Sequence, residues 1–285
     1  MTVEEKARWE PTGRSQPWRH MVAANARQYL ALLGRRARPR ARPAWLARPL
    51  VGTAAATLIA VLAATMITVD GWAVGAARHL PAWLIGALDE ATDFGKSVRV
   101  LLPIALMLAA TAMLARPALG RISRGVLAAL AVRLGFLFAA ICLPGLVFAI
   151  IKRLIGRARP LVEGAADPFI YRPFRWSVEY ASLPSGHAID AFAIATALGA
   201  LWPRARPLLW TYAVVIALSR VVLAAHFPSD VLAGAFIGVV GVLLVREWFA
   251  ARGLVFVRAA DGRARAMPGP SLARIKKVVG QLLAP

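Results

Sequence analysis

The hydrophobic positions of this 285-residue chain gather into long runs instead of alternating with polar positions, as they would on a half-buried element of a soluble protein. About twenty consecutive apolar residues are enough for a helix to cross a bilayer. Runs of roughly this length lie at about 50–69, 98–115, 126–151, 185–201, 208–224 and 229–248. The pattern predicts an all-α, polytopic membrane protein with six transmembrane helices.

The segment 72–94, between the first two runs, mixes apolar and polar residues. Trp72 and Trp83 stand among charged positions, and Arg78, Pro81 and Asp89 interrupt the apolar character. A segment of this kind lies in the plane of the membrane interface. We therefore expect an interfacial helix between the first two spans.

Both ends of the chain are polar and basic, and they flank a membrane domain expected over 49–250. Within the N-terminal segment 1–48, we expect a surface helix over 18–33 and an extended basic collar over 35–48 that is attracted to anionic lipid headgroups. Within the tail 251–285, a short amphipathic helix is expected over 271–283. Residues 1–48 hold no apolar core followed by a small-residue cleavage site, so no signal peptide is expected.

The formal net charge of +21 raises the question of a nucleic-acid partner. Lys and Arg concentrate in the first fifty residues, in short loops and in the tail, which is the distribution that orients membrane proteins. No nucleic-acid recognition motif accompanies the charge, so no such partner is expected. The only cysteine, Cys142, lies in an apolar run and excludes a disulfide within the chain.

The same charge distribution predicts a cytoplasmic N-terminal segment and tail, in the inner membrane of a bacterium whose genome is GC-rich, as the Ala and Arg usage indicates. The loops 70–97, 152–184 and 225–229 then face the periplasm or the exterior. Three short polar islands, at 152–160, 184–187 and 219–230, fall on that outer side. Charged groups beside hydrocarbon are costly to desolvate, so the three islands indicate one shared functional site.

The first and third islands supply cations that suit an anionic ligand. Lys152 and Arg159 are seven residues apart, about two helical turns, so both can point along one side of a helix end that Pro160 terminates. Arg220 lies near the outer end of an apolar run, where a phosphate would match its planar guanidinium. The alternative for the first pair is that both are loop or snorkelling cations.

The second island, Pro184-Ser185-Gly186-His187, opens an apolar run. The first backbone N–H groups of a helix are free and attract anions. Ser185 is placed to cap this helix, and capping by Ser185 with His187 merely at an interface is the alternative.

The third island also holds an imidazole and a carboxylate, His226 and Asp230, four residues apart. A carboxylate at that spacing can accept the imidazole N–H and leave the other ring nitrogen free to react. Capping of the last span by Ser229 or Asp230 is the alternative. A metal triad that includes His187 is disfavoured because nearby cations repel a divalent ion, so neither a metal nor a cofactor is expected.

Together the islands resemble the three-part signature of the type 2 phosphatidic acid phosphatase (PAP2) superfamily. The residues are Lys152-x6-Arg159-Pro160, Pro184-Ser185-Gly186-His187 and Ser219-Arg220-x5-His226-x3-Asp230. The match is complete in residues, order and spacing over roughly a third of the chain, and the expected six spans resemble the membrane branch of the family. The segment 92–97 is also similar to one found in bacterial lipid phosphatases of this family.

The resemblance implies a role for each residue. His226 would attack phosphorus and carry a phosphohistidine, with Asp230 orienting it, while His187 would protonate the leaving oxygen and then activate water. The residues implied to hold the phosphate oxygens are Lys152, Arg159, Ser185, Gly186 and Arg220.

The predicted function is metal-independent hydrolysis of a membrane lipid phosphate or diphosphate at the outer face of the membrane. Undecaprenyl diphosphate, phosphatidylglycerol phosphate and lipid A phosphate are all compatible with a basic outward-facing site, and a recycled polyprenyl carrier is preferred on the frequency of that activity in the family. A lipid phosphotransferase with the same site is the alternative. A non-catalytic lipid or anion transporter is less favoured, because transport does not require the two histidines.

Overall fold

The computed structural model describes residues 17–37, 46–164, 166–259 and 262–283. Helices make up most of these residues, and a short antiparallel hairpin follows the last long helix. The helices are α1 (Pro17–Leu33), α2 (Arg48–Thr68), α3 (Asp70–Ala77), α4 (Ala82–Thr92), η2 (Asp93–Gly95), α5 (Val98–Leu114), α6 (Arg121–Ile155), α7 (Gly186–Leu201), η3 (Pro203–Ala205), α8 (Arg206–Val222), α9 (Pro228–Ala251) and α10 (Leu272–Leu283). The strands are β1 (Phe256–Arg258) and β2 (Ala264–Ala266).

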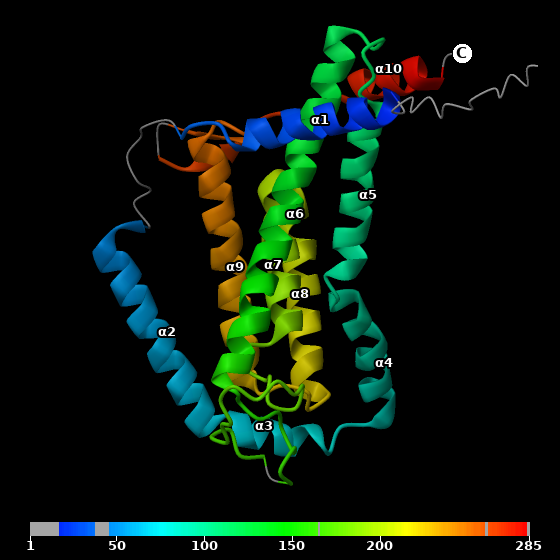
Figure 1. The fold of residues 1–285 in the computed structure, drawn as a ribbon. Coiled ribbons are helices and arrows are strands. Elements are labelled where there is room, and N and C mark those ends of the chain that lie inside the picture. The colour runs from blue at the N-terminus through cyan, green and yellow to red at the C-terminus, as the bar shows by residue number, and fades with distance from the viewer. Residues whose placement is uncertain (1–16, 38–45, 165, 260–261, 284–285) are drawn as a thin grey trace, which may run out of the picture.

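The long helices α5 to α9 run side by side as a bundle, and α2 leans away from it (Figure 1). Helix α7 contacts α6, α8 and α9, so it lies inside the bundle. Within the described residues, five helical segments are long and apolar enough to cross a membrane: Arg48–Thr68, Ala82–Leu114, Arg121–Ile155, Pro203–Val222 and Pro228–Ala251. Helix α7 is also apolar but shorter. The chain is a multi-pass membrane protein.

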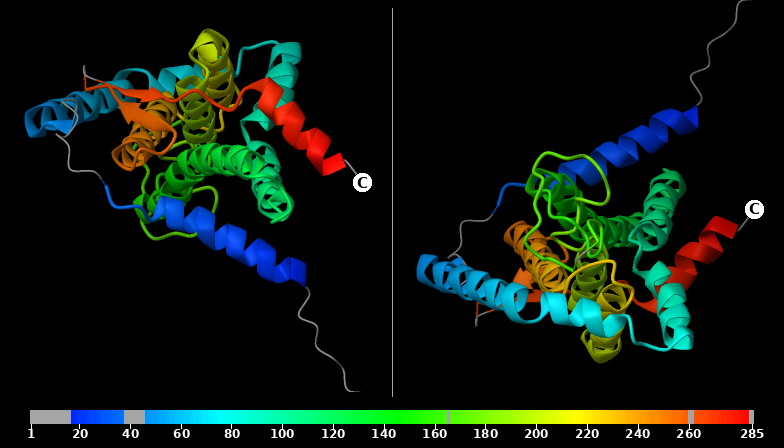
Figure 2. Two further views of the ribbon diagram at one scale, coloured as in Figure 1. Left: turned by 90° about the horizontal axis from the view of Figure 1, so that it is seen from above. Right: turned by 90° about the horizontal axis from the view of Figure 1, so that it is seen from below.

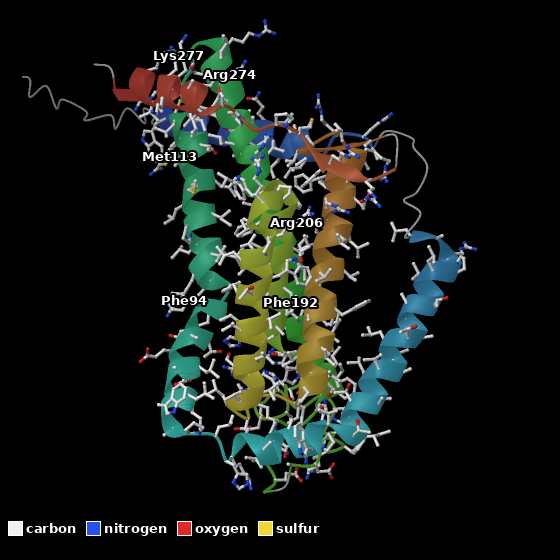
Figure 3. All side chains as sticks on the ribbon, turned by 180° about the vertical axis from the view of Figure 1, so that it is seen from behind. Phe94, Met113, Phe192, Arg206, Arg274 and Lys277 are labelled. Atoms are coloured by element: carbon white, nitrogen blue, oxygen red, sulfur yellow. The ribbon has the colours of Figure 1, made fainter. Side chains whose placement is uncertain are left out.

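Different helices and loops lie at the two ends of the bundle. At one end lie α1 and α10, and at the other lie α3 and the loop between α6 and α7 (Figure 1). Seen from below, α3 crosses the ends of α8 and α9 (Figure 2). Arg274 and Lys277 of α10 lie at the end opposite to α3 (Figure 3). The helices expected over 18–33 and 271–283 are present as α1 and α10, while positions 38–45 of the expected collar lie outside the described residues.

The segment 72–94 forms two helices instead of the single interfacial helix that we expected. Helix α3 lies across the bundle end, but α4 packs beside α8 and leads through η2 into α5 (Figure 1). The break falls at Pro81, which precedes α4 with an extended backbone. Ala82–Leu114 therefore forms one candidate span, longer than the 98–115 expected from hydropathy. Leu84, Ile85 and Leu88 of α4 are partly buried, whereas Asp89 and Glu90 are exposed. The local pattern does not distinguish such a helix, packed on α8, from one that lies at the membrane interface.

The chain is mostly helical, as expected, but the tail also contains a short hairpin that was not expected, in which β1 and β2 pair antiparallel with Phe256 opposite Ala266. Phe256 packs edge to face on Phe136 of α6, with 4.8 Å between the ring centroids. A partly buried ion pair of 2.6 Å joins Arg258 to Glu247 of α9. These contacts fasten the hairpin to the bundle.

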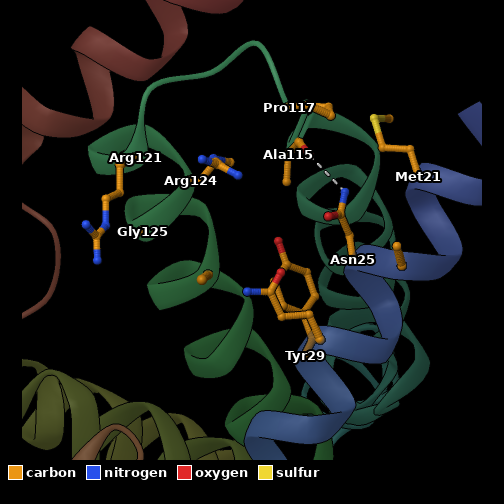
Figure 4. Close-up of a pocket in the computed structure, with 11 residues that line it drawn as sticks. Met21, Asn25, Tyr29, Ala115, Pro117, Arg121, Arg124 and Gly125 are labelled. Atoms are coloured by element: carbon orange, nitrogen blue, oxygen red, sulfur yellow. Dashed lines mark hydrogen bonds between the residues drawn. The ribbon is translucent and has the colours of Figure 1, made fainter.

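Helix α1 is held to the bundle by side-chain hydrogen bonds to the end of α5. Asn25 Nδ2 donates to the carbonyl oxygens of Ala112 and Ala115 at 2.8 and 2.9 Å, the latter drawn in Figure 4. The last carbonyls of a helix have no partner within it, so Asn25 satisfies acceptors that α5 leaves open.

Candidate active site at one end of the bundle

The three polar islands meet at the bundle end that holds α3. Lys152 lies in the last turn of α6, and Gly186 opens α7. Arg220 lies in the last turn of α8, and Asp230 in the first turn of α9. Four helix ends therefore deliver the predicted residues to one place, and the prediction that the islands lie on one side of the molecule is confirmed.

The first island is folded differently from our expectation. Helix α6 ends at Ile155, and Gly156 follows with a φ of 67°, a left-handed conformation that favours glycine. A Cβ at this position would also collide with the backbone of Arg172. Arg159 thus lies in the loop and not on the helix of Lys152, and its backbone N–H donates to Glu179 O at 2.7 Å. The loop brings the two cations within electrostatic range of each other.

Four buried polar atoms of the predicted site have no hydrogen-bond partner among the described residues. They are Arg159 Nε, Ser185 Oγ, His187 Nε2 and Arg220 Nε. Leaving a buried polar atom unpaired is costly, so a group of such atoms in one place is available to a ligand. The atoms come from three segments, and Arg159 and Arg220 both act electrostatically on His187. An anion placed among them would satisfy several at once.

Ser185 does not cap α7 as expected. It occupies the N-cap position without a side-chain hydrogen bond to the helix, and its backbone N–H donates to Asp230 O at 3.0 Å. That bond joins the start of α7 to the first turn of α9. The hydroxyl stays available for another partner.

His226 is buried in the turn between α8 and α9, beside Asp230. Its Nδ1 lies 3.7 Å from Asp230 Oδ2, longer than a hydrogen bond. Ser182 lies between them, since its Oγ donates to Asp230 Oδ2 at 2.6 Å and lies 3.5 Å from His226 Nδ1. Nε2 of His226 forms no hydrogen bond with the described residues. The predicted pair is therefore present in a looser form, with Ser182 as a third member that the spacing did not reveal.

Burial lowers the pKa of the His226 imidazole, because the cationic form is poorly solvated there, and the neighbouring Asp230 carboxylate only partly opposes this effect. The imidazole is consequently neutral near pH 7. A neutral ring has a lone pair on one nitrogen, which is the form that a nucleophile requires.

The carboxylate of Asp230 is held by an arginine that our sequence analysis did not assign to the site. Arg157 is fully buried, and its Nη1 donates to Asp230 Oδ1 at 2.6 Å. Its Nη2 donates to Asp70 Oδ2 at 2.8 Å, and the Asp70 carboxylate also accepts the backbone N–H of Ser229 at 2.9 Å. Burial acts to lower the pKa of Arg157, but the Asp230 and Asp70 carboxylates outweigh it and raise that pKa, so Arg157 stays charged.

One signal in the sequence pointed to these two residues. Arg157 falls within the first island, and Asp70 ends the first apolar run, so both are charges beside hydrocarbon. Their pairing was not readable, because 87 residues separate them along the chain.

The segment 92–97, which resembles one in bacterial lipid phosphatases, forms a wall of the site. Arg220 Nη1 donates to Thr92 Oγ1 at 2.7 Å. Gly95 lies against His187, and a Cβ on Gly95 would come within 3.2 Å of His187 Cδ2. The segment thus orients one predicted phosphate-binding cation and packs against one predicted catalytic histidine.

A cavity of about 350 Å³ adjoins the site between α5, α6 and α7. Its lining includes Lys152, Pro184 and Gly186 from the predicted signature. Another cavity, of about 460 Å³, lies at the opposite end of the bundle, between α1 and the start of α6 (Figure 4). Arg121 and Arg124 line it, but no signature residue does, so the candidate active site is the one at the α3 end.

The part of the chain that the structure describes contains no group of three or more His, Cys, Asp or Glu side chains that could hold a metal ion. The expectation of a metal-independent site stays a prediction, with positive charge available from arginine and lysine.

Comparison with known proteins identifies relatives over this region. Residues 133–254 match the model of the PAP2 superfamily. The lipid A 1-phosphatase of Rhizobium johnstonii is 38% identical over 127 residues, which are 45% of this chain and 52% of that protein. The lipid A 1-phosphatase of Rhizobium etli is 37% identical over 127 residues, 45% of this chain and 55% of that protein. The chain spans about half the length of these relatives.

Two solved structures are also similar. LpxE of Aquifex aeolicus has a TM-score of 0.43 at 20% identity. The match covers 60% of this chain and 89% of the LpxE chain. A transmembrane PAP2-type phosphatidylglycerolphosphate phosphatase of Bacillus subtilis has a TM-score of 0.37 at 19% identity, covering 80% of this chain and 96% of its own.

Proposed function

We propose, from the premise that residues 133–254 of this chain form a PAP2 superfamily domain, that the protein removes phosphate from a membrane lipid. The observation that carries the proposal is the set of unpartnered buried polar atoms on Arg159, Ser185, His187 and Arg220. They surround the start of α7, where free backbone N–H groups attract anions. The activity for which the Rhizobium relatives are named, lipid A 1-phosphatase, supports a lipid phosphate as the substrate class.

In the first chemical step, His226 Nε2 attacks phosphorus while the bond from phosphorus to the lipid oxygen breaks. His187 donates a proton to that oxygen, so the lipid leaves as an alcohol. Asp230 and Ser182 face the other ring nitrogen of His226 and favour the tautomer with a proton on Nδ1. The product on the enzyme is a phosphohistidine at His226.

In the second step, water attacks the phosphorus of the phosphohistidine and the bond from phosphorus to nitrogen breaks. His187 accepts the proton of the water, which returns both histidines to their starting states. Inorganic phosphate is released. Transfer to a lipid hydroxyl in place of water would use the same residues, and the two reactions differ only in the acceptor.

The negative charge of the phosphoryl group is held by the protein in both steps. Lys152, Arg159 and Arg220 supply positive charge, and Ser185 and the N–H of Gly186 supply hydrogen bonds. These three cations supply the positive charge that a divalent ion would otherwise have to supply, so the proposed reaction proceeds without metal.

The proposal extends to the arrangement in the membrane. Helix α7 has 16 residues and is about 24 Å long, and it lies among α6, α8 and α9, which supports counting it as a sixth span. The N-terminal segment 1–48 and the tail 251–285 then lie in the cytoplasm and flank the phosphatase domain over 49–250. The candidate site faces the periplasm or the exterior of a bacterial inner membrane.

Phosphate release by the purified full chain from a panel of lipid phosphates, with EDTA present, tests the proposed function. We expect release in EDTA, and we expect His226→Ala to abolish both turnover and acid-labile phosphate on rapidly quenched, denatured protein. His187→Ala should lose about 10²–10⁴-fold in rate while phosphoenzyme persists, because acid–base help is lost but the nucleophile remains.

The exposed His79 offers a matched control, since His79→Ala removes an imidazole outside the site and should keep wild-type activity. Complete loss of activity in EDTA with recovery on adding a divalent ion would contradict the proposal. Phosphoenzyme on His226→Ala and none on His187→Ala would exchange the roles of the two histidines.

A further inference from the structure

Helix α7 carries an acidic side chain one turn beyond the candidate site. Asp190 follows His187 by three residues, and it is the only charged side chain of Asp, Glu, Lys or Arg type in this largely apolar helix. A carboxylate within an apolar span is costly and is retained where it meets a polar partner or a ligand. The proposed reaction does not use Asp190.

The hydrogen-bonding capacity of Asp190 is mostly open. Among the described residues, Ser97 alone donates to it, from its backbone N–H at 3.3 Å and from its side chain. A carboxylate offers about four acceptor positions. Lys152 acts on Asp190 electrostatically, but no ion pair within 4.0 Å joins the two. The remaining acceptor positions of the carboxylate therefore have no partner within the described ranges.

The carboxylate faces the cavity of about 350 Å³ that adjoins the site. Gly145 of α6 makes room for it, since a Cβ on Gly145 would lie 3.0 Å from Asp190 Oδ1. Lys152 and Gly186 line the same cavity, and Leu101 and Phe148 give it apolar walls. A lipid whose phosphate lies at the start of α7 would thus place its next few atoms beside Asp190.

We propose that Asp190 forms a subsite that accepts a hydrogen bond from a hydroxyl or amide N–H adjoining the phosphate of the substrate lipid. This inference rests on the proposed function and specifies its substrate class. Phosphatidylglycerol phosphate, 1-acyl-glycerol 3-phosphate and the phosphates of sugar and sphingoid lipids carry such a donor, whereas phosphatidic acid does not. Polyprenyl phosphates carry none, because the carbons next to their phosphate are hydrocarbon. The subsite therefore argues against the polyprenyl carrier that we preferred from sequence.

A pair of substrates that differ by a single hydroxyl tests the subsite. They are 1-acyl-glycerol 3-phosphate and its 2-deoxy analogue, assayed in mixed micelles with the purified full chain. We expect kcat/KM to favour the hydroxyl-bearing lipid by about tenfold to a hundredfold, as for a hydrogen bond to a charged group. Asp190→Ala should bring that ratio close to one, and Asp190→Asn should give an intermediate ratio. Because the ratio is taken within one enzyme, a loss of folded protein cancels.

Cys142→Ala is the matched control, because it changes the same cavity without altering the carboxylate, and it should keep the wild-type ratio. A wild-type ratio near one, or a ratio that survives in Asp190→Ala, would overturn the subsite while leaving the phosphatase proposal intact. Phosphate release from neither lipid, with no phosphoenzyme on His226, would overturn the proposed function and the subsite together.

Discussion

Individual polar residues of the site differ in whether the protein already satisfies them. Asp230 accepts hydrogen bonds from Arg157, Ser182 and the backbone N–H of Phe227. His187 Nε2, by contrast, is buried without a partner among the described residues. A satisfied group holds the site in shape, while an unsatisfied one is available to a ligand. Burial and pairing together therefore separate positioning residues from those expected to touch the substrate.

The state of His226 leads to a prediction on pH. Its imidazole must be neutral to attack phosphorus, and burial lowers its pKa below the usual value near 6.5. A lowered pKa moves protonation to lower pH, so we expect the acid limb of phosphoenzyme formation to lie below pH 6.5. Rapid-quench measurements of kcat/KM from pH 5 to 8 would show this limb, after correction for the second ionisation of the substrate phosphate, which lies at about pH 6. An acid limb centred above pH 6.5 would contradict the assignment of His226 as a buried nucleophile.

At the scale of elements, Arg157 joins parts of the fold that are far apart in sequence. It links the loop after α6 to Asp70 at the start of α3 and to Asp230 in the first turn of α9. Its guanidinium also stacks on the Phe227 ring, with 4.6 Å between Arg157 Cζ and the ring centroid. Every charge in this network is fully buried, so the network is stable only when all its members are present.

Removal of one member should therefore destabilise the fold strongly. We expect Asp70→Ala to lower the free energy of unfolding by about 3–5 kcal/mol, because it breaks a buried ion pair and leaves Arg157 Nη2 and the backbone N–H of Ser229 without their acceptor. Denaturant unfolding of the purified protein in detergent micelles measures the change. Asp93→Ala is the control, since Asp93 pairs with Lys96 and Arg99 at the surface, where ion pairs contribute little. Equal stability of the two variants would show that the buried network does not hold α3.

At the scale of the whole molecule, the candidate site and the basic tail occupy opposite ends of the bundle (Figure 1). Helix α6 has 35 residues and is about 52 Å long, longer than the roughly 30 Å hydrocarbon core, so it extends past the membrane. Helix α2 has no buried residue, so most of its surface is free to contact lipid.

This arrangement predicts the topology of the chain in the cell. A reporter fused after α10 should be active in the cytoplasm, and a cysteine tag within 166–175 should be labelled by a reagent that does not cross the membrane. The physical reason is that Arg and Lys near the spans are retained on the cytoplasmic side. Labelling of the 166–175 tag only after the membrane is permeabilised would contradict the proposed orientation. A tag in the tail serves as the inside control.

The sequence by itself determined most of the apolar helices, the helices α1 and α10, and the three polar islands. Each of these depends on local properties of the chain, namely the length of an apolar run, the periodicity of one helix or the spacing within a motif. The shared side of the islands also followed, because spans that cross a membrane alternate between its two faces.

Only the tertiary structure decided how the buried charges are paired. The bonds from Arg157 to Asp70 and Asp230, the position of Ser182 beside His226, and the cavity at Asp190 all join segments that are distant in sequence. The route of α4 along α8 and the hairpin in the tail likewise depend on packing partners. A buried charge must find a partner, but the sequence does not say which one, because the choice depends on how whole helices pack.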